Sequence, residues 1–149
     1  MKKVVSFFLC MCLIIAILAV PVSANPNSGM ILVSETVEYI DGDTYFVERI
    51  YIPGICPYSN GKTATKTAEG FYKGATVFSI SLTGHFTYDG TFAVATSASV
   101  AVRASVSGAS LNSKNAYTSG ASAIGSCSVS YVGVTLNKTV TLTCDANGN

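Results

Sequence analysis

Apolar side chains occupy every second position through the middle of the chain, with polar side chains between them. The pattern is clearest from Phe78 to Tyr88 and from Phe92 to Val106, where most even-numbered residues are apolar. Such alternation is typical of β-strands with one buried face. Residues that pair across a hairpin share a face, and both arms are expected to have their even-numbered residues inward. The loop between the arms should therefore have an odd number of residues. The loop Tyr88-Asp89-Gly90, with Gly90 in the left-handed conformation, meets this condition and places Phe86 opposite Phe92.

Strand patterns also lie on either side of this central pair. Residues 34–40 and 44–52 flank Asp41-Gly42-Asp43, which predicts a hairpin with a tight turn. A Thr-rich strand is expected from Lys62 to about Phe71, and alternation returns over residues 117–131. The last strand is expected to place three residues inward: Val140, Leu142 and Cys144.

Two stretches between these strands predict connections. Residues 53–61 are rich in Pro and Gly and predict a loop that holds Cys56, and residues 107–119 predict a connection rich in Gly, Ser and Asn. About seven strands with one apolar face each are best buried as two sheets packed face to face. We therefore expect an all-β fold over residues 34–149, a single antiparallel two-sheet sandwich of immunoglobulin-like type.

The first 24 residues have the three parts of a signal peptide. Lys2 and Lys3 precede an apolar run of about 17 residues, and Val22-Ser23-Ala24 is an ending of the type that signal peptidase cleaves. We expect cleavage before Asn25, a secreted extracellular protein without stable membrane insertion, and a flexible segment over residues 25–33. A lipid anchor is not expected, because Cys10 lies near the start of the apolar run.

The composition of the mature part limits its partners. Its 125 residues correspond to one domain, and without Lys2 and Lys3 seven basic residues stand against eight acidic ones. This balance gives no electrostatic basis for binding nucleic acid or an anionic membrane surface.

Three cysteines remain after cleavage, namely Cys56, Cys127 and Cys144, and this odd number permits one disulfide. We favour Cys127–Cys144, because both residues have inward parity on consecutive strands. They would lie opposite each other if the loop is 134–137, whereas a two-residue loop at 137–138 would set Tyr131 opposite Cys144. A bond from either cysteine to Cys56 stays open.

No catalytic, cofactor-binding or metal-binding residue is assigned. His85 is the only histidine, so any scheme of the Ser-His-Asp, Cys-His or histidine-metal type must include it. It has outward parity, and we interpret it as a solvated strand residue. Three cysteines without C-x-x-C spacing and one histidine also make a poor zinc site.

The carboxylates form two close pairs in the sequence, Glu35 with Glu38 and Asp41 with Asp43. A glycosidase needs two carboxyl groups across a cleft, and nothing in the sequence indicates a cleft. Asp41 and Asp43 are explained by turn chemistry. Residues 145–149 imitate the start of a calcium loop, with oxygen donors at alternate positions. They stop before the positions of the loop's glycine and bidentate glutamate, so a frayed polar terminus is favoured.

Four strings cover much of the mature chain: residues 35–52, 62–67, 82–90 and 140–149. In these strings the chain resembles an uncharacterised family of small secreted proteins of Gram-positive bacteria. The resemblance implies export and β-structure and carries over no active site. The family pattern has a cysteine shortly after residues 86–90, where this chain has none, so the partner that the pattern gives Cys144 is missing here.

The sequence has many residues typical of sheet faces and turns and few acid–base groups. We expect a non-enzymatic extracellular or cell-surface module with a binding or structural role and no cofactor. Rows of outward Ser and Thr suit a cell-wall polysaccharide, and another extracellular protein is the second partner considered. A small secreted hydrolase is one alternative, and it would need His85 in a pocket beside a carboxylate or cysteine. A secreted inhibitor or bacteriocin-like factor is another, and it would need a protruding loop, for which residues 52–61 are the candidate.

Overall fold

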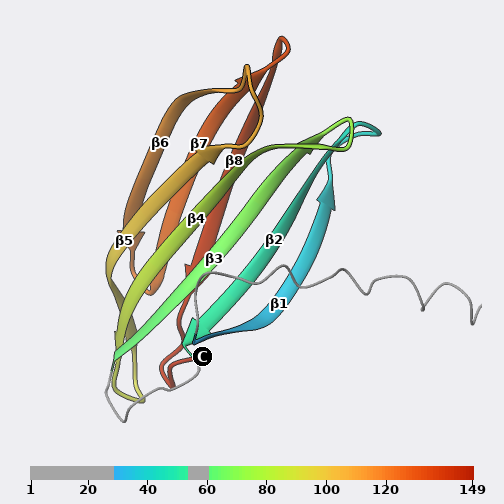
Figure 1. Ribbon diagram of the computed structural model, residues 1–149. Coiled ribbons are helices and arrows are strands. Elements are labelled where there is room, and N and C mark those ends of the chain that lie inside the picture. Colours follow the sequence, from blue (N-terminus) through green and yellow to red (C-terminus); the bar gives the residue numbers. More distant parts are fainter. Residues whose placement is uncertain (1–28, 54–60) are drawn as a thin grey trace, which may run out of the picture.

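The computed structural model describes residues 29–53 and 61–149 and contains two antiparallel sheets (Figure 1). The expected signal peptide, residues 25–28 and the loop that holds Cys56 lie outside the described residues. Within the described part there is no helix, and so none that is long and apolar enough to cross a membrane.

Sheet A has five strands in the order in which the chain runs. They are β1 (Met30–Tyr39), β2 (Thr44–Pro53), β3 (Gly61–Tyr72), β4 (Ala75–Tyr88) and β5 (Ala93–Ala104). Sheet B has three, again in chain order: β6 (Ser110–Ser119), β7 (Ser122–Tyr131) and β8 (Val134–Thr143). The expected all-β sandwich of two antiparallel sheets is confirmed, with eight strands in the described residues. The likeness to immunoglobulin domains extends to this layering, whereas the strands follow chain order without Greek-key connections.

Two segments that were expected to be irregular form strands. Residues 110–119, predicted to be part of a connection, form β6, in which every side chain except Ala116 is exposed. β6 is held at the edge of sheet B by its backbone pairing with β7 and has no buried face, so alternation could not reveal it. The predicted flexible segment 25–33 is also wrong from Met30 onward, because β1 begins there and pairs with the end of β2.

The hairpin of β4 and β5 corrects the predicted loop. Tyr88 pairs with Ala93, so the loop has four residues, and Phe86 lies opposite Ala95 rather than Phe92. The Asp89 carboxylate accepts hydrogen bonds from the N–H groups of the two residues that end this loop. A bulge lies between His85 and Phe86. From Gly84 back to Phe78, even-numbered residues again pair with even-numbered residues, as the parity predicts, for example Leu82 with Val100. Phe92 is exposed instead of inward, while Gly90 has the predicted positive φ of 88°.

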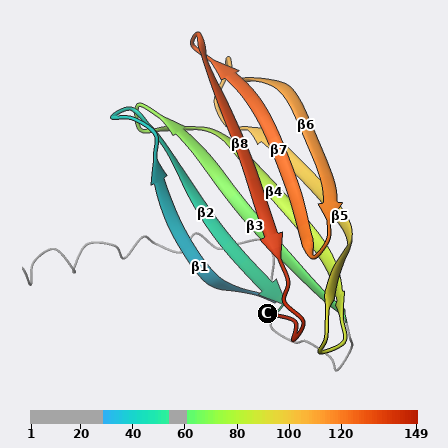
Figure 2. The ribbon, with the colours of Figure 1, turned by 180° about the vertical axis from the view of Figure 1, so that it is seen from behind.

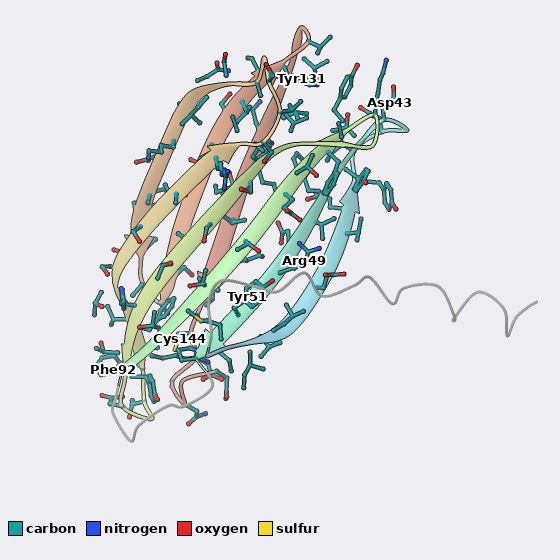
Figure 3. All side chains as sticks on the ribbon, in the orientation of Figure 1. Asp43, Arg49, Tyr51, Phe92, Tyr131 and Cys144 are labelled. Carbon is teal, nitrogen blue, oxygen red and sulfur yellow. The ribbon has the colours of Figure 1, made fainter. Side chains whose placement is uncertain are left out.

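The favoured disulfide between Cys127 and Cys144 is wrong. The turn between β7 and β8 is Val132-Gly133, so Cys127 lies opposite Lys138, and Cys144 follows six residues later. At about 3.4 Å per strand residue this separates the two Cα atoms by roughly 20 Å, whereas a disulfide needs less than about 7 Å. Both thiols are buried and form no disulfide within the described residues, and the alternative of a bond to Cys56 lies outside them. Tyr131 and Cys144 lie at opposite ends of the sandwich, which also rules out the alternative register (Figure 3).

The core lies between the sheets, where the inward residues of β3 and β4 meet those of β7 and β8. Its largest fully buried side chains are Phe78, Ile80, Leu82, Val77, Val129 and Val140. Sheet B does not cover all of sheet A, because β6 and β7 pack over β5 and β4, and β8 packs over β3. The strands β1 and β2 therefore extend beyond the edge of sheet B, as Figure 2 shows from behind.

Candidate functional site

His85 lies on the outer face of β4, as its parity predicts, and is exposed. Its Nδ1 atom is 2.8 Å from the Thr63 hydroxyl of the neighbouring strand β3. This hydroxyl is the one side-chain hydrogen-bond partner found for the ring among residues 29–53 and 61–149. The geometry that a hydrolase would require, with a carboxylate or thiol beside the ring, is not formed by these residues.

Glu35 and Glu38, the first carboxylate pair, both lie in β1 but point to opposite faces of the strand. Glu35 points to the outer face and bonds to Arg49, whereas Glu38 points to the inner face and bonds to Lys138. The two groups therefore lie on opposite sides of sheet A, and they cannot act together on one glycosidic bond.

Two other acidic residues organise turns, as predicted for Asp41. The Asp41 carboxylate accepts the N–H groups of Asp43 and Thr44, each at 2.8 Å, and the bond from Asp43 holds the pKa of Asp41 below its ordinary value. The Asp145 carboxylate accepts the N–H groups of Asn147 and Asn149, which lowers its pKa as well. These oxygens are occupied by the chain's own donors.

The terminus predicted to be frayed is a closed turn docked on sheet A. The N–H of Gly90 donates to the Ala146 carbonyl, and the Lys62 ammonium donates to the Gly148 carbonyl. None of the residues that the structure describes form a cluster of three or more His, Cys, Asp or Glu side chains suited to a metal ion. Residues 145–149 thus fasten the end of the chain to the neighbouring hairpin.

A group of polar side chains converges on the outer face of sheet A. We define this face by residues that point away from sheet B: Glu35, Tyr39, Tyr45, Arg49, Tyr51, Thr67, Glu69, Phe71, Ser79 and Ser81. At its centre Arg49 Nε donates to Glu35 at 2.7 Å, and Arg49 Nη1 donates to Glu69 at 2.6 Å. These bonds outweigh the effect of partial burial and raise the pKa of Arg49. One guanidinium thus connects β1, β2 and β3 and is held in one orientation.

An aromatic row crosses the same three strands at the end of the face near the β1–β2 turn. The rings of Tyr39 and Tyr45 are 5.5 Å apart, and those of Tyr45 and Phe71 are stacked at 4.5 Å with planes 3° apart. Because stacked rings turn their faces toward each other, Tyr45 and Phe71 offer mainly their edges to a ligand. We interpret the row mainly as cross-strand stabilisation of the sheet.

A shallow hollow of about 200 Å³ lies beside Arg49. Its polar lining comes from three strands: Arg49, Tyr51, Thr67, Glu69, Ser79 and Ser81. Figure 3 shows Arg49 and Tyr51 side by side along β2. The hollow combines a fixed guanidinium, one carboxylate, one phenol and three hydroxyls, a set that can donate and accept hydrogen bonds.

Sequence reasoning did not single out Arg49, although part of the signal was present. A hairpin centred on Gly42 sets residues equidistant from it opposite each other, and this places Glu35 opposite Arg49 as observed. The positions of Glu69 and Ser79 beside Arg49 depend on the register of β3 on β2 and of β4 on β3. The turn around Gly42 does not determine these two registers. No family model, curated protein or solved structure matches this chain.

Proposed function

We propose that this protein is a non-enzymatic extracellular binding module and that its ligand contacts the hollow on the outer face of sheet A. The observation that carries the proposal is the double fixation of Arg49 by Glu35 and Glu69 beside a row of hydroxyl groups. A side chain whose rotamer is fixed before binding loses less entropy when a ligand arrives. The extracellular location rests on the leader pattern of residues 1–24.

The charges around the hollow favour a neutral, hydroxylated ligand. Two carboxylates bond to a single guanidinium, so the local net charge is negative and an anionic ligand would be repelled. Rows of Ser, Thr and Tyr hydroxyls pair well with the hydroxyls of a polysaccharide. A neutral cell-wall polysaccharide is therefore the ligand class we favour, with another extracellular protein as the second.

Binding can be tested with the chain from Asn25 to Asn149, which contains all the strands that the structure describes. Affinity electrophoresis through a neutral and through an anionic cell-wall polysaccharide should show retention by the neutral polymer. Arg49→Ala should weaken that retention by at least about tenfold, or about 1.4 kcal/mol of binding free energy. Lys114→Ala on exposed β6 removes one cation from the other sheet and is the matched control.

Both variants should remain folded, because exposed ion pairs contribute only about 0–1 kcal/mol to stability. Retention that is equal for the wild type and Arg49→Ala would place the ligand elsewhere. Failure to bind either polymer or any extracellular protein would contradict the binding function itself.

A further inference from the structure

A second surface, distinct from the outer face of sheet A, is left open by the offset between the sheets. A groove of about 340 Å³ runs beside the overhanging strands β1 and β2. Its floor includes Val33, Ile50 and Ile52, and residues 141–144 at the edge of β8 form its wall. An apolar floor beside a strand edge is the environment that another strand would fill.

The overhanging inner face of β1 and β2 is apolar beside the groove and charged nearer to the β1–β2 turn. Toward the β1–β2 turn, Lys138 of β8 bonds to Glu48 at 2.7 Å and to Glu38, and Lys66 bonds to Glu48 at 2.7 Å. This cluster contains two cations and two anions, so it carries no net charge. A partner that covers this whole face should therefore be apolar at one end and balanced in charge at the other.

The two strands that border the groove each have a free edge. In the described residues β1 pairs only with β2, and β8 pairs only with β7. β1 is ten residues long, and Ile31, Leu32 and Val33 are each about half exposed, at 52%, 45% and 51%. A long apolar edge strand of this kind is a site for pairing with another chain.

The strand directions make these two edges compatible. Neighbouring strands alternate in direction within each sheet, and the short connection after β5 reverses the chain again before β6. β1 therefore runs opposite to β8, as Figures 1 and 2 both show. A twofold rotation about an axis parallel to the strands preserves strand direction and exchanges the two layers. It would bring β1 of a second copy beside β8 in an antiparallel arrangement.

The numbers of strands fit this rotation without a gap. Sheet A has five strands and sheet B has three, so two strands of each copy overhang. In the rotated pair, β1 and β2 of each copy would cover the β2 and β1 of the other. Each layer would then contain eight strands, five from one copy and three from the other.

We propose that two copies of this chain form a symmetric dimer in which β1 of each copy pairs with the free edge of β8 of the other, and the overhanging inner faces of β1 and β2 cover each other. The rotation keeps every residue at its height along the strands. The apolar end of one groove therefore meets the apolar end of the other, and the two neutral ion clusters come together at the opposite end. The outer faces of sheet A remain free on opposite sides of the dimer, so this interface is independent of the proposed ligand site.

Sedimentation velocity of the chain from Asn25 to Asn149 tests the dimer over a range of concentrations. We expect a species of twice the chain mass. Val33→Lys should raise the dimer dissociation constant by at least about a hundredfold, because the symmetry places two unpaired charges in one interface. Leu111→Lys is the matched control, since Leu111 is also a partly exposed apolar residue, 41% exposed, next to a bulge in an edge strand. It lies on β6, at the far edge of sheet B.

Amide hydrogen exchange provides a second readout that does not depend on a variant. Residues 30–37 and 138–143 should exchange more slowly as protein concentration rises, because their edge groups become paired in the dimer. A chain that is monomeric at every concentration would overturn the proposal. So would masses above twice that of the chain, or an assembly that Leu111→Lys disrupts and Val33→Lys leaves intact.

Discussion

The His85 ring contacts a hydroxyl group of the neighbouring strand and is otherwise open to solvent. We predict that His85→Ala leaves the melting temperature nearly unchanged, because surface substitutions of this kind alter stability by no more than about 0.5 kcal/mol. Retention on the polysaccharide that the wild type binds should also be unchanged. Calorimetry and affinity electrophoresis measure the two effects. A variant that keeps its fold and loses activity by about a hundredfold would instead indicate general acid–base catalysis.

Cys127 lies between the sheets with 4% of its surface exposed. Burial raises the pKa of its thiol to about 11, so the thiol stays protonated near neutral pH. Since the thiolate is the reactive form, we predict that iodoacetamide leaves Cys127 unmodified in the folded protein and modifies it after denaturation. Peptide mapping by mass spectrometry checks both states. Rapid alkylation of Cys127 in the folded chain, or a Cys127–Cys144 disulfide in a non-reducing map, would contradict this packing.

Among the strands, β4 of sheet A and β7 of sheet B come close together at Gly84. A Cβ atom added there would lie 2.8 Å from the Cβ of Ala123 and 2.8 Å from the Phe86 ring. We predict that Gly84→Ala destabilises the protein by about 1–3 kcal/mol, the usual cost of overpacking a core. Urea unfolding measures this difference. Gly42→Ala is the control, because a Cβ atom at Gly42 has no heavy atom within 4 Å. Equal stability of the two variants would show that the sheets separate easily at this point.

At the scale of the whole molecule, Lys138 joins the two sheets through Glu48 and Glu38. Burial alone would raise the pKa of Glu48, but the hydrogen bonds from Lys138 and Lys66 outweigh it and hold that pKa below its ordinary value of 4.5. Burial alone would lower the pKa of Lys138, but the bonds to Glu38 and Glu48 raise it above its ordinary value of 10.5. The charged forms of both groups are therefore favoured by folding.

These shifts predict how stability depends on pH. The contribution of Glu48 is fully present above pH 4.5 and is lost as the pH falls through its lowered pKa in the folded state. The contribution of Lys138 is fully present below pH 10.5 and is lost as the pH rises through its raised pKa. Urea midpoints at a fixed protein concentration should therefore decline on both sides of this range. Lys138→Met should weaken the alkaline decline, and an unchanged alkaline decline would assign it to other groups.

The sequence by itself determined the features that depend on residues close together in the chain. Alternating side chains identify β4 and β8, because successive residues of a strand point to opposite faces whatever packs on them. The hairpin around Gly42 aligns Glu35 with Arg49, and the turn roles of Asp41 and Gly90 follow from their side chains and backbone freedom. These features depend on residues close together in the chain, although the alignment of Glu35 with Arg49 was recognised only in the structure.

Tertiary structure decided the features that depend on distant neighbours. β6 has no buried face, so only its pairing with β7 makes it a strand. Lys138 has inward parity, but its role depends on β2 and β1, which lie about a hundred residues away in the chain. The open groove results from five strands packing on three. Each of these features depends on the register of one strand on another or on the offset between the sheets. Local patterns along one strand do not encode these arrangements, because packing between segments sets them.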